Sequence, residues 1–186
     1  MRKFDWDNIP DADEYNVPVP GAYIAVITRV EDVEHREYLK IEWEFAEGRY
    51  KGENRATYDR AGFWPYAIIR SYKEKALPFF KAFKTALEES NRGYRFDEGD
   101  LRAMVGCRIG VVLGEEEYEK KNGGIAKRLY VAQTRSIAAI QKGDFTVPDL
   151  KPLKSGSGTT GGALSSYYPS YDQFSQDVDD GGDLPF

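Results

Sequence analysis

The stretch Tyr38-Leu-Lys-Ile-Glu-Trp-Glu-Phe45 decides the fold class of this chain of 186 residues. Every second residue in it is large and apolar, namely Leu39, Ile41, Trp43 and Phe45. Side chains on a β-strand point alternately to its two faces, so this period of two predicts a strand with one buried and one solvated face. We therefore expect a strand over residues 36–46, with the Trp43 ring in the core.

The segments on either side of this strand also predict β-structure. Residues 22–30 are rich in β-branched and aromatic side chains, which predicts a first strand. After a turn, a segment near 54–60 is where we expect the third strand. Apolar residues return at 105–113, and Asn122-Gly123 predicts a hairpin that joins this fourth strand to a fifth over 125–134.

Between the third and fourth strands the apolar residues take on a helical period: Ile69, Tyr72, Ala76, Phe80, Phe83 and Leu87. This spacing predicts a helix between Pro65 and Asn91. Pro78 lies inside it and predicts a kink or two consecutive helices, because proline lacks the backbone N–H. A last helical turn is expected over 136–142. The order is three strands, a helix and a hairpin, so the predicted fold class is mainly β.

Both ends differ in composition from residues 21–150, which we interpret as one domain. Residues 1–20 hold three prolines and five acids, and this composition suits an extended N-terminal arm. Residues 151–171 are rich in glycine, serine and tyrosine and suit a flexible linker. Residues 172–186 form an acidic tip, and we expect the linker and the tip to be disordered.

The net charge of −5 lies entirely at the C-terminal end. All 26 lysines and arginines precede residue 155, together with 26 of the 31 acids, and the other five acids follow it. The segment 15–154 has 24 bases and 21 acids, which leaves it a charge of +3. A mildly basic body with an acidic tail indicates an interaction tail and an anionic partner for the body.

Several function classes are not expected from the residues. A single cysteine and a single histidine leave no set of zinc ligands, and the chain shows neither a signal peptide nor a membrane-spanning run. The stretch Gly156-Ser-Gly-Thr-Thr-Gly161 matches a dinucleotide-binding pattern, but no strand or helix is expected beside it to support that site. The acidic cluster 115–119 is followed directly by two lysines, which favours a solvated loop. We expect a cytoplasmic protein that is not an enzyme and holds no cofactor or metal.

The last residues, Asp183-Leu-Pro-Phe186, have the chemistry of a docking peptide. Phe186 offers a ring and a carboxylate on one residue, and Pro185 restricts the backbone before it. A partner would hold the ring in an apolar pocket and the carboxylate on an arginine or lysine. A generic acidic end is the alternative. The predicted partner-binding residues are Asp179, Asp180, Asp183, Leu184, Pro185 and Phe186.

A family resemblance joins this tip to five segments of the body: Gly21-Ala-Tyr-Ile, Tyr38-Leu-Lys-Ile, Gly48-Arg-Tyr-Lys-Gly, Gly114-Glu-Glu-Glu-Tyr and Gly143-Asp-Phe-Thr-Val-Pro. The tip resembles that of bacterial single-stranded DNA-binding proteins, and the body is similar to phage-encoded single-stranded DNA-binding proteins. The resemblance implies a five-stranded OB-fold barrel with its helix between strands 3 and 4. It also implies that the protein coats single-stranded DNA in phage DNA replication, recombination or repair. This would take place in the cytoplasm of a bacterial host, and the tip would recruit replication or recombination proteins.

The predicted DNA-binding surface follows from what such a site needs. Sequence-independent binding uses aromatic rings for bases and cations for phosphates, and OB-folds place them on strands two and three and on adjoining loops. In three clusters of this chain, a tyrosine lies between two basic residues, and a tryptophan follows the third cluster. Residues of the hairpin are expected to form the opposite wall of the site. The predicted DNA-binding residues are Arg36, Tyr38, Lys40, Arg49, Tyr50, Lys51, Arg55, Tyr58, Arg60, Trp64, Lys121, Lys127, Arg128 and Tyr130.

Two other functions are left open by the sequence. One is a β-barrel adaptor that displays the docking tail and binds no DNA. The other is a metal-dependent phosphoesterase that uses the carboxylates of residues 115–119. Self-association of the chain also stays open.

Overall fold

The computed structural model describes residues 3, 17–120 and 123–153. The chain divides after Leu153 into two units, and only the first contains described residues. Most of the predicted arm and linker lies outside the described residues, as do the predicted tip residues Asp179, Asp180, Asp183, Leu184, Pro185 and Phe186.

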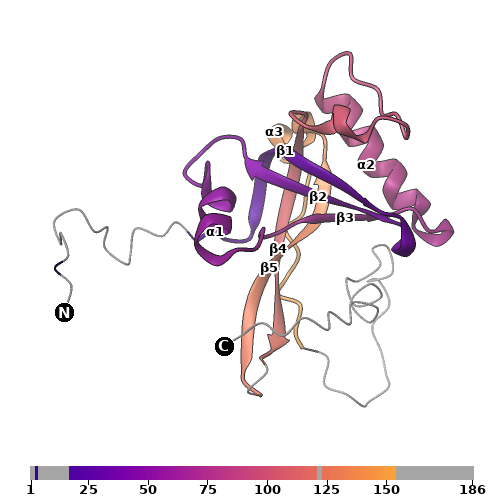
Figure 1. Cartoon of the computed structure of the whole chain (residues 1–186). Helices are drawn as coiled ribbons and strands as arrows, with labels where there is room; N and C mark the ends of the chain where they lie inside the picture. The colour runs from indigo at the N-terminus through magenta and orange to yellow at the C-terminus, as the bar shows by residue number, and fades with distance from the viewer. Residues whose placement is uncertain (1–2, 4–16, 121–122, 154–186) are drawn as a thin grey trace. The chain divides into compact units, whose positions relative to one another are not determined.

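One antiparallel sheet of five strands organises the described part of the chain (Figure 1). Its strands are β1 (Gly21–Val33), β2 (Tyr38–Phe45), β3 (Ile68–Ser71), β4 (Arg108–Glu119) and β5 (Ile125–Arg135), and they lie side by side in the order β3-β2-β1-β4-β5. The helices are α1 (Glu53–Ala61), α2 (Leu77–Ser90) and α3 (Ile137–Lys142), with short 3-10 turns η3 (Glu34–Arg36), η4 (Glu74–Ala76) and η5 (Leu101–Met104). The mainly β fold class and a helix between the third and fourth strands are therefore confirmed.

The alternating stretch forms β2, as predicted. Leu39, Ile41, Trp43 and Phe45 are all buried, and the residues between them face the other side of the sheet. The Trp43 and Phe45 rings meet edge to face, with their centroids 4.9 Å apart. Such ring pairs add to the stabilisation that burial alone provides, so β2 supplies the centre of the core.

The predicted third strand near 54–60 is wrong, because this segment forms the helix α1. Its residues lack a period of two and include several good helix formers, such as glutamate, arginine and alanine. Gly52 and Gly62 flank the helix with φ values of 87° and 77°, a backbone conformation that glycine adopts without strain. These two glycines, which are separated by the nine residues of the helix, thus mark the two ends of α1.

The third strand instead lies at Ile68–Ser71, inside the segment that was predicted to be helical. Ile69 and Tyr72 match a helical spacing only by coincidence, since Ile69 belongs to β3 and Tyr72 follows it. Pro78 occupies the first turn of α2. Its missing N–H costs nothing there, because the first N–H groups of a helix have no intrahelical partner. Pro78 therefore begins a helix and does not kink one.

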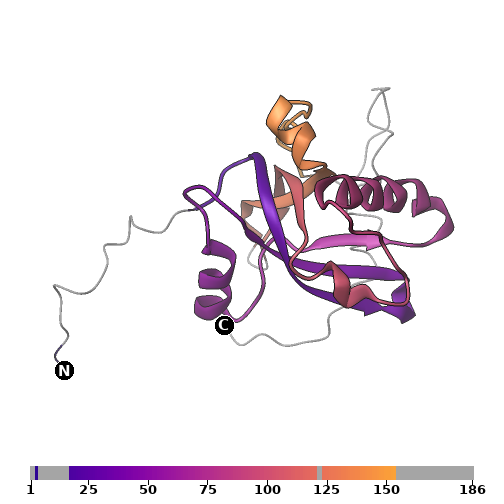
Figure 2. The ribbon, with the colours of Figure 1, turned by 90° about the horizontal axis from the view of Figure 1, so that it is seen from above.

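β3 and β5 are the two edge strands of the sheet, and among the described residues no backbone pairing joins them. A side-chain hydrogen bond links them: Arg70 Nη2 on β3 donates to Thr134 Oγ1 on β5 at 2.9 Å. The buried Phe83 of α2 lies beneath the same guanidinium, 5.5 Å from ring centroid to Cζ. Seen from above, α2 runs along one side of the sheet, far from α1 (Figure 2). α2 thus packs where the sheet is left open.

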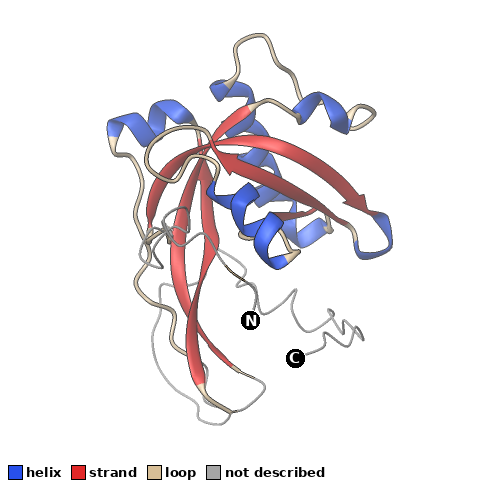
Figure 3. Cartoon of the chain, turned by 60° about the vertical axis from the view of Figure 1, so that its left-hand side comes forward, coloured by secondary structure: helices blue, strands red, loops and turns tan. Residues whose placement is uncertain are grey.

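The β4–β5 hairpin continues past the rest of the sheet as a long two-stranded arm (Figure 3). A returning segment, residues 148–153, lines the free edge of β4 in this arm. The N–H of Lys151 donates to the carbonyl of Glu115, and the N–H of Glu117 donates to the carbonyl of Lys151, both at 2.9 Å. The described residues therefore continue to Leu153, and residues 151–153 contact β4.

Candidate nucleic-acid interface

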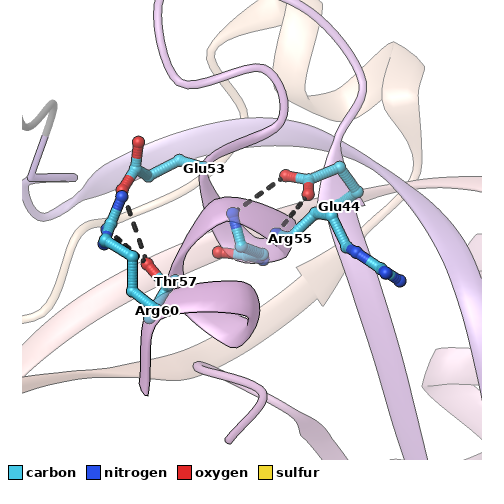
Figure 4. Close-up of polar contacts among 6 residues, drawn as sticks. Glu44, Glu53, Arg55, Thr57 and Arg60 are labelled. Carbon is cyan, nitrogen blue, oxygen red and sulfur yellow. Dashed lines mark hydrogen bonds and ion pairs between the residues drawn. The ribbon is translucent and has the colours of Figure 1, made fainter. Parts of the chain in front are cut away.

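α1 is attached to β2 by polar contacts. The Glu44 carboxylate accepts the N–H groups of Asn54 at 3.2 Å and Arg55 at 2.8 Å (Figure 4). These N–H groups have no partner within the helix, and a carboxylate at a helix N-terminus also interacts favourably with the helix dipole. Gly52 at the N-cap position has no side chain for this task, so the neighbouring strand supplies the cap.

A single backbone carbonyl of β2 holds both ends of the α1 segment. Trp43 O accepts a hydrogen bond from Asn54 Nδ2 at 2.8 Å and another from Trp64 Nε1 at 3.1 Å. β3 pairs with β2 only over Tyr38–Ile41, so Trp43 lies beyond the end of that pairing. The α1 segment therefore occupies the edge of β2 that β3 does not reach.

Exposed aromatic rings gather on α1 and the loop that follows it. Tyr58 is 42% exposed and Phe63 60% exposed. The Tyr58 and Trp64 ring centroids lie 5.7 Å apart, and the Arg55 guanidinium lies 5.6 Å from the Tyr58 centroid. We call Arg55, Tyr58, Phe63 and Trp64 the α1 platform. A contiguous exposed apolar patch indicates an interaction site, whereas single exposed apolar residues are common on any protein.

Arg60 lies on the neighbouring side of the same helix. Its Nη2 contacts the Glu53 carboxylate at 2.8 Å and the Thr57 hydroxyl at 3.1 Å (Figure 4). Arg55 forms a comparable ion pair with Asp59 at 3.1 Å, and the side chains of both members are more than half exposed. Exposed ion pairs contribute little to stability, so breaking the Arg55–Asp59 pair would cost little.

The solvated face of β2 carries Tyr38 and Lys40, as predicted, but the basic side chains on this face form ion pairs with a glutamate. Lys40 Nζ lies 3.9 Å from the Glu42 carboxylate, and Arg29 on β1 lies 3.7 Å from the same group. Arg36 ends the 3-10 turn before β2, at the end opposite to α1. The predicted residues of β2 are thus spread along the strand and do not form one cluster with α1.

Tyr50 does not fit its predicted role as a stacking ring. It is 4% exposed, and its centroid lies 5.6 Å from those of both Tyr23 and Phe45. Arg49 covers the Tyr50 ring, with Cζ 4.5 Å from the centroid, and also donates a hydrogen bond to its hydroxyl. Lys51 beside it is exposed. Tyr50 is therefore a core residue, because the chain turns its ring back under β2.

The predicted opposite wall does not form as one surface. Neighbouring residues of a strand point to opposite faces, so Lys127 and Arg128 on β5 lie on different faces of the arm. Lys127 pairs with Glu115 at 3.4 Å, and Arg128 pairs at 2.7 Å with Glu116, which also contacts Lys151. Tyr130 is half-buried, and its pKa is raised by burial and by Glu116. Lys121 lies outside the described residues.

Sequence reasoning missed two residues of this site. Glu44 was assigned only to a solvated face, and Asn54 to a strand, yet both attach α1 to β2. Gly62 was the available signal, because a glycine just after a run of helix formers marks the C-terminus of a helix.

No family model and no curated protein matches this chain. Across residues 17–120 and 123–153, no helix is both long and apolar enough to cross a membrane. Within the same ranges, no three side chains of the metal-binding types gather at one point. The resemblance to single-stranded DNA-binding proteins therefore stays a prediction from the quoted segments.

Proposed function

We propose that this protein binds single-stranded DNA without sequence preference, and that the α1 platform is its main stacking site. The carrying observation is that the Tyr58 and Trp64 rings lie 5.7 Å apart beside Arg55, and that the exposed Phe63 precedes Trp64 in the chain. Every base has a flat face, so rings bind bases of any sequence, at about 1–3 kcal/mol per stacked base. Arginine beside the rings supports both stacking and phosphate binding.

The fold supports the same proposal. An OB-fold is a partly open five-stranded barrel that binds its ligand on strands two and three and adjoining loops. We propose that this sheet is such a barrel, closed between β3 and β5 by the Arg70–Thr134 hydrogen bond and by α2 in place of a backbone ladder. α1 lies in the connection between β2 and β3, which is within the expected binding region.

The charge of the α1 region suits a polyanion. Residues 49–60 contain four bases, Arg49, Lys51, Arg55 and Arg60, against the two acids Glu53 and Asp59, which leaves a charge of +2. On the arm, by contrast, the carboxylates of residues 115 and 116 form ion pairs with the basic side chains of residues 127, 128 and 151. We therefore propose that the phosphates of the bound DNA strand contact the α1 region rather than the arm.

The tip completes the proposed function. We propose that residues 172–186 recruit replication or recombination proteins to the coated strand, with Phe186 as the anchor. The setting that the resemblance implies is a phage-infected bacterial cytoplasm. Binding is proposed here and not catalysis, because Glu116, the centre of the acidic cluster, is 4% exposed and is held by Arg128 and Lys151.

A titration with a labelled oligo-dT at two salt concentrations tests this function. We expect saturable binding that weakens as salt rises, because lysines and arginines release counterions from the phosphates they contact. A duplex of the same length is the control and should bind more weakly. Absence of oligo-dT binding at low salt would contradict the proposal and favour the adaptor.

A further inference from the structure

A hollow lies between the start of β1 and the turn that follows β2. Its walls are formed by Val19, Tyr23, Glu47, Gly48, Arg49 and Tyr50, and its volume is about 290 Å³. We call it the Tyr23 pocket. None of its residues belongs to the α1 platform, so it requires an explanation of its own.

The floor of the Tyr23 pocket is aromatic and firmly packed. The Tyr23 ring meets Phe45 edge to face at 5.2 Å and Tyr50 edge to face at 5.6 Å. Burial, and to a lesser extent Tyr50, raises the pKa of Tyr23, so its phenol is neutral at physiological pH. These contacts fix the rings in place, and a flat ligand therefore finds a rigid surface.

The rim of the pocket is cationic. Arg49 lies over Tyr50 on one side, and the ion pair between Arg108 Nη2 and Glu47 Oε2, 2.7 Å long, lies on the other. Arg49 therefore lines the pocket directly, and Arg108 reaches its edge through Glu47. An aromatic ligand that carries an adjacent anion fits this combination.

The polar atoms of the wall favour a nucleobase over a phenyl ring. The Tyr23 hydroxyl donates to the Val19 carbonyl at 2.7 Å, and the Tyr50 hydroxyl accepts from Arg49. The two hydroxyls also hydrogen-bond to each other, and because a hydroxyl has one donor and two acceptor positions, each keeps an acceptor position for a ligand N–H. A nucleobase has polar edges that use this capacity, whereas a phenyl ring would leave it unused.

We propose that the Tyr23 pocket holds one base of the bound strand, with the phosphate of that nucleotide on Arg49. The proposal rests on the proposed function, since it places a further nucleotide of the same strand. The pocket is joined to the start of the helix that carries the platform: the N–H of Glu53, the first residue of α1, donates to the carbonyl of Tyr50 at 3.0 Å. A strand on the platform therefore reaches the pocket by passing the N-terminus of α1.

The test fills the pocket from its exposed side. Val19→Trp places a large ring at the mouth, and Val17→Trp adds the same ring at an exposed residue two positions earlier that does not line the pocket. We expect Val19→Trp to weaken oligo-dT binding roughly tenfold, which corresponds to the loss of one stacked base. Arg49→Ala should give a similar loss, and Val17→Trp should bind like the wild-type chain.

Two further probes separate the outcomes. Thymidine 5′-monophosphate should shift the NMR signals of the Tyr23 ring in the wild-type chain and leave them unchanged in Val19→Trp. If the wild-type chain binds oligo-dT and all three variants bind it equally, the pocket proposal fails and the proposed function stands. If oligo-dT does not bind but the nucleotide does, the proposed function fails and the pocket remains a nucleotide site. Binding of an acidic peptide that ends in phenylalanine, blocked by Val19→Trp without any effect on oligo-dT, would overturn the pocket proposal.

Discussion

The helices α1 and α2 are attached to the same sheet by different means. α2 buries Phe83, Ala86 and Leu87 and packs where β3 and β5 leave the sheet open. α1 buries only Asn54 and is held by hydrogen bonds to Glu44 and Trp43, while its tyrosine faces solvent. A helix held by its polar groups keeps its rings available for a ligand. We infer from this difference that α2 stabilises the fold, and α1 is the element that we propose as the binding surface.

The largest expected effect comes from removing a ring from each helix in turn. Phe83→Ala should lower the free energy of unfolding by about 3–5 kcal/mol, because it leaves a cavity in the core. Tyr58→Ala should lower it by only about 0.5–1.5 kcal/mol, because the ring is 42% exposed and the main loss is its pair with Trp64. Denaturant unfolding of both variants measures the contrast. Equal losses would show that α1 is also a core element.

The next effect concerns DNA binding, where substitutions on the α1 platform should have a larger effect than a substitution on α2. Tyr58→Ala and Phe63→Ala should each weaken oligo-dT binding by about 1–3 kcal/mol, or roughly 5- to 150-fold. Leu77→Ala is the matched control, because Leu77 at the start of α2 is 47% exposed and apolar. A direct binding titration of all three variants is the measurement. A loss in Leu77→Ala as large as in Phe63→Ala would argue against a specific site on α1.

A smaller effect is expected from the cap of α1. Glu44→Ala removes the acceptor of the Asn54 and Arg55 N–H groups and should cost about 1 kcal/mol of stability. It should also weaken oligo-dT binding, because the platform loses its fixed position. Glu31→Ala, which removes only a surface ion pair with Arg29, is the control and should leave both quantities nearly unchanged.

The smallest effect is expected from removing the C-terminal tail, which belongs to neither helix. A chain that ends at Leu153 keeps all the described contacts, so its unfolding should be unchanged and its oligo-dT affinity equal or higher. A chain that ends at Leu150 also loses Lys151, which contacts Glu116 at 3.4 Å and pairs with the arm. The longer of the two should be the more stable. Weaker DNA binding by the chain that ends at Leu153 would contradict this expectation and show that the tail helps to bind the DNA.

The two helices also mark the limit of what the sequence predicted. β2 followed from its own residues, because alternation of buried and solvated side chains is a local property of a strand. The element type at 54–60 did not, because α1 depends on a cap from Glu44 and on the carbonyl of Trp43, ten or more residues earlier in the chain. Arg55, Tyr58 and Trp64 still come together, on a helix and loop where a strand was expected. The ion pairs that occupy the lysines and arginines of β2 and the arm were not foreseen either, since ion pairs across strands depend on the register of the strands.

The most direct test of the claim that bases stack on α1 uses tryptophan fluorescence. In a Trp6→Phe background two tryptophans remain, Trp43 in the core and Trp64 on the platform. We expect oligo-dT to quench the emission of this protein, and Trp64→Phe in the same background to remove most of the quenching, because Trp43 is fully buried. Quenching that persists undiminished in the Trp64→Phe variant would show that the bases stack elsewhere.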